Sequence, residues 1–176
     1  ALSALVDQGK ILYYGVSEEW GGARIEKAQA IIEKYGLHPM TVIQPQYNMM
    51  DRYIEHELMD ICEKNGIGIT PFSPLAQGLL TGKYKKGQPY PEGSRATHQA
   101  DKQVNALLTD ENLDKVEALS AIAAELGTNM SVLALAWILR KDCISSVITG
   151  ASKPSQLENN LAAAGFKIPA DALKEI

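Results

Sequence analysis

Residues 67–84, IGITPFSPLAQGLLTGKY, join a short apolar run to a glycine-rich turn and a lysine. The run 67–70 has the apolar, β-branched composition of a buried strand. A turn of this kind at the end of a strand presents backbone N–H groups, and Lys83 adds a cation, so the segment suits a phosphate group. The stretch therefore points to a nucleotide cofactor.

Composition narrows the range of partners. The chain has 176 residues, 45% of them hydrophobic and 22% charged, with a formal net charge of −4. This length fits one globular domain. The negative charge argues against nucleic acid as the main partner, and no apolar run approaches the ~20 residues of a membrane helix. No secretory signal peptide is visible at the first residues.

Two cysteines, Cys62 and Cys143, are expected to be reduced thiols, which indicates a reducing cytoplasm. The three histidines match no zinc spacing, so no metal site is expected. The chain starts at Ala1 inside an apparent helix without a cap, which suggests a fragment of a longer protein.

Hydrophobic periodicity alternates between strands and helices along the chain. The pattern predicts strands at 11–16, 41–44, 67–72 and 145–149, and helices at 2–9, 22–35, 53–64, 112–126, 130–141, 154–163 and 168–176. Such alternation is typical of a parallel α/β sheet. No GxGxxG follows a strand, which disfavours a Rossmann fold. Four strand–helix units instead fit half of a (β/α)₈ barrel, since a complete barrel needs ~250 residues.

Two segments depart from the simple alternation. Residues 73–111 show little periodicity, and loops this long are usually functional or disordered. The segment 130–141 is apolar nearly all round, which predicts a buried helix capped by Thr128 or Asn129.

Six blocks of sequence, in order, carry a family resemblance. They are GKI–YGVS at 9–17, QPQYN at 44–48, SPLA–GLLTGKY at 73–84, GSR at 93–95, AWIL at 136–139 and VITGAS–QL–NN at 147–160. Together the chain resembles the aldo-keto reductase superfamily, in the branch of the voltage-gated potassium channel β subunits and related bacterial reductases.

The resemblance implies a single-domain fragment, residues 1–176, that forms the C-terminal half of a (β/α)₈ TIM barrel. The four strands would be the fifth to eighth, and 73–111 would be a long cofactor-covering loop after the seventh. The family transfers hydride between NADPH and an aldehyde or ketone. Its catalytic Asp, Tyr, Lys and His come from the first four strands, so no catalytic residue is assigned here.

The same resemblance assigns the nicotinamide end of the cofactor. Phe72 would stack on the ring, while Gln44 and Ser17 would bind the carboxamide. A core aromatic and a buried, hydrogen-bonded amide are the ordinary alternatives for Phe72 and Gln44. Trp20 would line the substrate pocket, or lie in a surface loop.

The phosphate and adenine end is assigned to two loops. Lys83 and Arg95 are the expected phosphate ligands, and Lys85 and Lys86 are expected to be solvated lysines. The other expected cofactor contacts are Ser73, Pro74, Leu75, Ala76, Gly78, Gly150, Ser152, Gln156, Asn159 and Asn160.

Three functions follow from this interpretation. The first is an NADPH-dependent carbonyl reductase of which this chain supplies most of the NADP(H) site. The second is a non-catalytic NADP(H)-binding regulatory subunit of the channel β type. The third is a free-standing half-barrel that assembles with another chain. A homo-oligomer, or pairing with an N-terminal half, is expected because a half-barrel leaves strand edges unpaired.

Overall fold

The computed structural model describes residues 1–17, 21–97 and 102–176. They form two compact units, and each is described by itself. Unit 1 comprises residues 1–47, 51–72 and 142–148, and unit 2 comprises residues 48–50, 73–141 and 149–176. The expectation of one domain for the whole chain stays a prediction.

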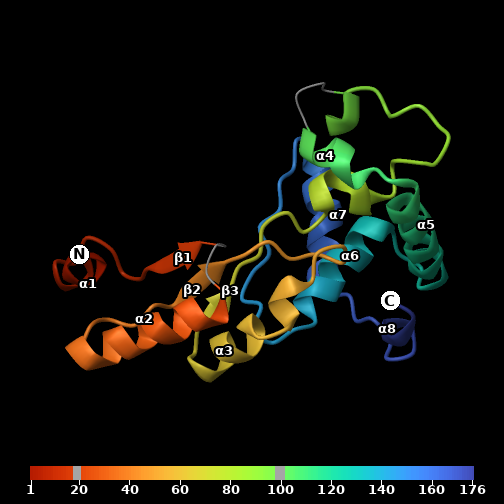
Figure 1. Cartoon of the computed structure of the whole chain (residues 1–176). Coiled ribbons are helices and arrows are strands. Elements are labelled where there is room, and N and C mark those ends of the chain that lie inside the picture. The colour runs from red at the N-terminus through yellow and green to blue at the C-terminus, as the bar shows by residue number, and fades with distance from the viewer. Residues whose placement is uncertain (18–20, 98–101) are drawn as a thin grey trace. The chain divides into compact units, whose positions relative to one another are not determined.

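Unit 1 is built on a three-stranded parallel sheet in the order β1-β2-β3. The strands are β1 (Gly15–Ser17), β2 (Val42–Gln44) and β3 (Gly68–Ile69). Figure 1 shows them side by side, with helix α2 running alongside. Because consecutive strands are parallel, each pair needs a crossover connection, and helices supply it here. The predicted parallel α/β arrangement is confirmed in this unit.

Three predicted strands are wrong in extent. The strand predicted at 67–72 is reduced to Gly68–Ile69. In the segment 11–16, only 15–16 are in a strand, and Leu12 and Tyr13 are 77% and 73% exposed, so the run is not buried on both faces. No described strand covers 145–149. A parallel bridge joins Ile144, just before this segment, to Ile69, and within the segment Ser145 N donates to Ile69 O at 2.9 Å and Ile148 N donates to Pro71 O at 3.0 Å. The apolar composition of these segments correctly predicted that they lie next to the sheet. It did not predict how many of their residues pair with a neighbouring strand.

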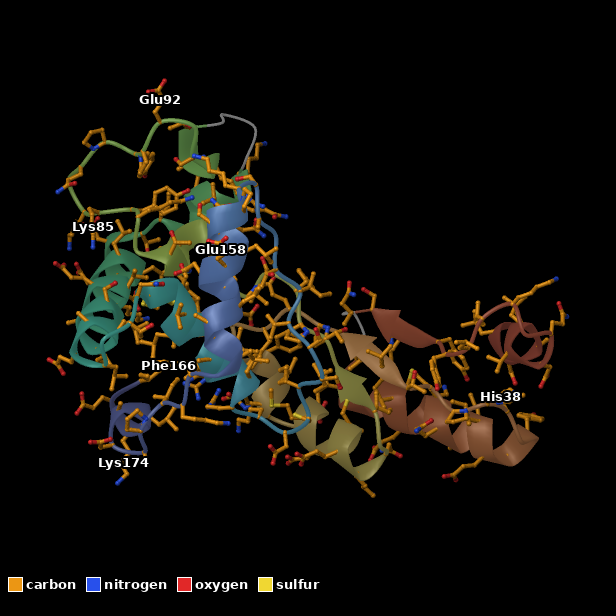
Figure 2. The ribbon with its side chains drawn as sticks, turned by 180° about the vertical axis from the view of Figure 1, so that it is seen from behind. His38, Lys85, Glu92, Glu158, Phe166 and Lys174 are labelled. Carbon is orange, nitrogen blue, oxygen red and sulfur yellow. The ribbon has the colours of Figure 1, made fainter. Side chains whose placement is uncertain are left out.

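The other elements of unit 1 are helical. They are α1 (Leu2–Asp7), α2 (Gly22–Tyr35), the 3-10 turn η1 (Tyr53–Glu55) and α3 (Leu58–Lys64). The predicted helix 53–64 is therefore interrupted at residues 56–57. Ile25, Ile43, Ile69 and Cys62 are fully buried in this core. At its periphery His38 lies beside α1, where its Nε2 is 2.8 Å from Asp7 Oδ1 (Figure 2).

Unit 2 is helical among its described residues. Its elements are η2 (Ala76–Thr81), η3 (Arg95–Thr97), α4 (Lys102–Leu107), α5 (Asp110–Glu125), α6 (Met130–Leu139), α7 (Pro154–Leu161), η4 (Ala162–Ala164) and α8 (Ala172–Glu175). The segment 73–111 thus contains three short helices and the start of α5. Leu79, Leu80 and Val104 bury their side chains in one cluster. Local periodicity missed these turns because each is too short to show a repeat.

Helix α6 forms the centre of unit 2 (Figure 1). Nine of its ten residues are buried, and it packs against α5, α7, η2 and η4. Asn129 caps it, since Asn129 Oδ1 accepts a hydrogen bond from Val132 N at 3.1 Å. The predictions of a buried helix and of this cap are confirmed. In the described ranges no single helix is long and apolar enough to cross a membrane, although α5 and α6, bent by 88°, pass that test of length and composition as a pair.

Candidate functional site

The carboxyl ends of the strands in unit 1 bring three expected cofactor residues to one edge of the sheet. Ser17 and Gln44, the last residues of β1 and β2, are register partners, and both are exposed. Phe72 follows β3 and forms a parallel bridge with Gln46, two residues beyond Gln44. Register partners in a parallel pair project from the same face of a sheet. The hydroxyl and the amide are therefore neighbours, and the half-buried aromatic follows at the next strand.

Unit 2 begins with an unusual turn at residues 73–78. Ser73, Ala76 and Gln77 have φ values of 54°, 46° and 57°, in the left-handed region that disfavours side chains with a Cβ. These are the non-glycine residues with positive φ in the described chain. Strained backbone of this kind persists only where neighbouring contacts hold it, and it concentrates at functional sites.

Several hydrogen bonds hold the turn. The Ser73 carbonyl accepts from Asn48 Nδ2 and from Ala76 N, both at 3.0 Å. Leu75 O accepts from Gly78 N at 2.9 Å and from Leu80 N at 3.1 Å. Asn48 itself is only 1% exposed, so its side chain is a fixed internal support. The contacts restrain the SPLAQG segment from both ends.

Two cations are brought to adjacent residues of this turn. A Cβ built on Gly78 would lie 3.2 Å from Lys83 Nζ, so the ammonium occupies the space that a side chain there would need. Lys83 Nζ also lies 5.1 Å from the centre of the Tyr84 ring. Arg95 Nη1 donates a hydrogen bond to Gln77 Oε1. Lys83 and Arg95, twelve residues apart in the sequence, therefore both reach residues 77–78.

Two buried hydroxyls adjoin these cations in the sequence. Tyr84 is 2% exposed and Ser94 is 6% exposed, and neither side-chain hydroxyl has a hydrogen-bond partner among the described residues. Buried polar atoms without a partner are rare and call for an explanation, such as a bound water or ligand. The two cations at adjacent residues of the turn fit an anionic group with several oxygens.

The neighbouring lysines behave differently from Lys83. Lys86 is exposed, as expected, and its Nζ lies 2.9 Å from Asp114 Oδ2 and 3.7 Å from Asp110 Oδ2, so it forms surface ion pairs with α5. Its hydrogen bond to Asp114, with the charges of both aspartates, raises the pKa of Lys86. Lys85 is exposed, as expected, and Figure 2 shows it with Glu92 on the loop between η2 and η3. The ammonium group of Lys86 is therefore paired with two carboxylates of α5.

The start of α7 carries the other expected contacts. Ser152 N and Ser152 Oγ donate to Gln156 Oε1 at 2.8 and 3.1 Å, so Gln156 caps the residues ahead of the helix. Pro154 occupies the first turn, as the sequence predicts. Gly150 and Ser152 are exposed in the same segment, and Asn160 is half-buried one turn further on. Trp20, the expected substrate contact, lies outside the described residues.

The family assignment rests on the whole chain. The model of the aldo/keto reductase family matches residues 1–176. The chain belongs to this family. It is 41% identical over 182 residues to a putative voltage-gated potassium channel subunit beta of Schizosaccharomyces pombe, matching 100% of this chain and 52% of that protein. It is 38% identical over 168 residues to L-glyceraldehyde 3-phosphate reductase of Escherichia coli K12, covering 93% and 47% respectively.

The aldo/keto reductase fold is also found by structure. A glycerol dehydrogenase from Gluconobacter oxydans matches with a TM-score of 0.76 at 24% identity, over 99% of this chain and 50% of that one. The chain spans about half the length of the curated relatives it matches. A partial α/β barrel of this family is consistent with the parallel strands of unit 1.

Sequence reasoning missed several residues of this aldo/keto reductase chain that shape the site. Gln77 lies inside the quoted stretch, yet no motif marks it as different from its neighbours. Asn48 supports Ser73 from 25 residues away, a pairing that only the folded chain shows. In the described part of the chain, no group of three or more metal-ligating side chains is present.

Proposed function

We propose that this chain supplies most of the NADP(H) site of an aldo-keto reductase that interconverts carbonyl and alcohol groups. In this proposal the chain is the C-terminal half of the barrel, with its strands as the fifth to eighth. The catalytic Asp, Tyr, Lys and His map to no position of the chain, so they would come from elsewhere in the whole protein. NADPH, when bound, supplies the hydride for reduction of an aldehyde or ketone.

The proposal rests mainly on two contacts of the turn: Lys83 Nζ lies next to Gly78, and Arg95 donates a hydrogen bond to Gln77. A phosphate group binds most strongly where cations and hydrogen-bond donors are already in place, because little ordering remains to be done. The turn 73–78 is held by internal hydrogen bonds, and both cations reach it from the following loop. These features support a phosphate-binding role for the turn.

The remaining residues divide by the part of the cofactor they would bind. The nicotinamide would be bound by Phe72, Gln44 and Ser17. The middle part of the dinucleotide would lie along residues 73–78. Gly150, Ser152, Gln156, Asn159 and Asn160 would receive the adenosine end together with Lys83 and Arg95. Gln156 and Asn159 both have partners in the structure, so binding by them would require an exchange of hydrogen bonds.

The relatives suggest what the whole protein does. The E. coli relative is named a reductase of L-glyceraldehyde 3-phosphate, which supports small aldehydes as substrates. The relatives named channel β subunits favour the alternative of a non-catalytic, NADP(H)-binding regulatory subunit. The free thiols Cys62 and Cys143 suit a reducing cytoplasm. A homo-oligomer or a complex with an N-terminal half would complete the barrel.

Fluorescence titration of the purified protein with NADPH and NADH tests the cofactor assignment. Arg95→Ala should weaken NADPH by roughly 1–3 kcal/mol, the value of a charge-assisted hydrogen bond, and leave NADH nearly unchanged. Lys85→Ala is the matched control, because it removes an exposed cation from the same loop. Equal losses of the two cofactors in Arg95→Ala would contradict a role at the 2′-phosphate.

A separate assay tests the missing catalytic set. The 176-residue chain alone should not reduce simple aldehydes with NADPH, since no positioned tyrosine would protonate the developing alkoxide. Turnover above a buffer control that persists through purification would show that this chain carries its own acid.

A further inference from the structure

Gln77 joins two parts of unit 2 through both ends of its side-chain amide. Its Nε2 donates to Ser73 Oγ at 2.6 Å, and its Oε1 accepts from Arg95 Nη1. Ser73 lies four residues before Gln77, whereas Arg95 lies eighteen residues after it. The amide therefore connects the strained turn to η3 across the long loop.

The backbone at Gln77 makes a side chain costly. Its φ of 57° and ψ of 20° lie in the left-handed region, which glycine adopts without penalty. The following residue, Gly78, continues with a φ of 99°. A glutamine here bears a conformational cost that a glycine would avoid, so its side chain has to provide a compensating interaction.

An amide suits this position for a chemical reason. One glutamine side chain donates through its nitrogen and accepts through its oxygen at the same time. Glutamate could accept from Arg95 and from the Ser73 hydroxyl, but its carboxylate would neutralise the charge of Arg95. Lysine or arginine could donate to Ser73 but could not accept from Arg95. The amide makes both contacts without bringing a charge to Arg95.

Neutrality matters for Arg95. Lys86, a few residues earlier, is paired with the carboxylates of Asp114 and Asp110. In contrast, no carboxylate lies within ion-pair distance of Arg95 in residues 1–17, 21–97 and 102–176. The amide holds the guanidinium in place, and it adds no negative charge that would neutralise it. A guanidinium has five N–H donors, so the others remain for an anion.

We propose that Gln77 is a positioning residue that holds Arg95 for the 2′-phosphate of the dinucleotide without neutralising its charge. This rests on the proposed function, because it takes Arg95 as a phosphate ligand. Gln77 acts by restricting the side chain of Arg95 before the ligand arrives, which lowers the ordering cost of binding.

Two substitutions of Gln77 distinguish the loss of its hydrogen bond to Arg95 from the neutralisation of the Arg95 charge. Gln77→Gly removes the amide and relieves the left-handed backbone, so the melting temperature should stay the same or rise. Its preference for NADPH over NADH should fall by roughly three- to tenfold, as expected for the loss of one ordering hydrogen bond. Gln77→Glu keeps an acceptor for Arg95 but neutralises its charge, so the preference should fall by at least as much. High salt should diminish this effect.

The double variant Gln77→Gly/Arg95→Ala decides whether Gln77 acts through Arg95. Gln77→Gly should change the NADPH-to-NADH affinity ratio in the natural background but not in the Arg95→Ala background. A merely structural role of Gln77 would weaken both cofactors alike and leave this ratio unchanged.

Different results would contradict the positioning role of Gln77 and the proposed role of Arg95 at the 2′-phosphate. If Arg95→Ala lowers the ratio while Gln77→Gly and Gln77→Glu both leave it unchanged, the positioning role is wrong and the proposed function stands. If Arg95→Ala itself leaves the ratio unchanged, the assignment of Arg95 to the 2′-phosphate is wrong, and the role of Gln77 falls with it.

Discussion

Asn129 Nδ2 donates a hydrogen bond of 2.6 Å to Asn159 Oδ1, while Asn129 Oδ1 caps the start of α6. One side chain thus ties the first turn of α6 to α7. Because the Asn159 oxygen is engaged, its NH₂ group is the part left to meet another acceptor. Asn159 is therefore fixed by a residue that the sequence marked only as a helix cap.

Substitutions at Asn129 should separate these two contacts. Asn129→Ser retains a capping oxygen but cannot reach Asn159 in the same way, so it should cost only about 0.5–1 kcal/mol of unfolding free energy. Asn129→Ala loses the cap as well and should cost about 1–2 kcal/mol more. Urea unfolding of the two variants measures the difference. Identical losses would mean that the cap contributes nothing.

Gly15 should tolerate no side chain. A Cβ at Gly15 would lie 2.2 Å from the carbonyl oxygen of Val42, its register partner in β2. Backbone cannot move aside as a flexible side chain does, so Gly15→Ala should destabilise unit 1 by about 3 kcal/mol, near the upper end of overpacking effects.

Gly21→Ser is the matched control in the same unit. A Cβ at Gly21 meets its nearest atom at 3.8 Å, and serine is a favourable residue at this helix cap. Its stability should be unchanged or slightly higher by chemical denaturation. A Gly15→Ala variant as stable as Gly21→Ser would mean that β1 and β2 do not pair in this register.

Cys62 should be an unreactive thiol. Burial, with a smaller contribution from the charge of Cys143, raises the pKa of Cys62 from 9.0 to about 11. A rise of about two pH units lowers the thiolate fraction near neutral pH by about 100-fold, and only the thiolate reacts. In a Cys143→Ser background, where burial remains as the main cause of the raised pKa, labelling of Cys62 with a disulfide reagent at pH 8 should therefore be much slower than in urea. Fast labelling of the folded protein would contradict the buried position.

The same thiol should make stability depend on pH in alkaline solution. The folded-state pKa is raised, so the stabilisation is complete below about pH 9, where the thiol is neutral in both states. It is lost as the pH rises toward about 11, because the unfolded thiol ionises first. The loss should amount to roughly 2–3 kcal/mol. Cys62→Ala should flatten this part of the curve in urea unfolding at several pH values.

The edge of β1 should drive association. Among the described strands β1 pairs only with β2, and Leu12 and Tyr13 before it are exposed. Unpaired strand edges beside apolar side chains invite pairing with another chain. Light scattering of the purified chain should show dimers or larger species, and Leu12→Lys should reduce them. A monodisperse monomer at high concentration would mean that the edge is protected.

Helix α6 shows how far local pattern could go. Its apolar residues on every face predicted that it is buried. An asparagine just before the helix predicted the cap, because its side-chain oxygen can accept a backbone hydrogen bond. Both are properties of a few consecutive residues. The strand predicted at 145–149 failed for the opposite reason. The hydrogen bonds between two strands depend on both of them. The composition of 145–149 alone therefore does not determine whether β3 is long enough to pair with it.

The sequence by itself determined the strand–helix alternation, through short-range periodicity, and the family resemblance, through the identity and order of its motifs. That resemblance assigned Lys83 and Arg95 as candidate phosphate ligands. Tertiary structure alone decided that Gln77 holds Arg95, that Asn48 supports Ser73, and that Lys86 is paired with α5. Each of these joins residues 18 to 28 positions apart. Such contacts depend on how the chain closes its loops in space, which no local pattern of side chains records.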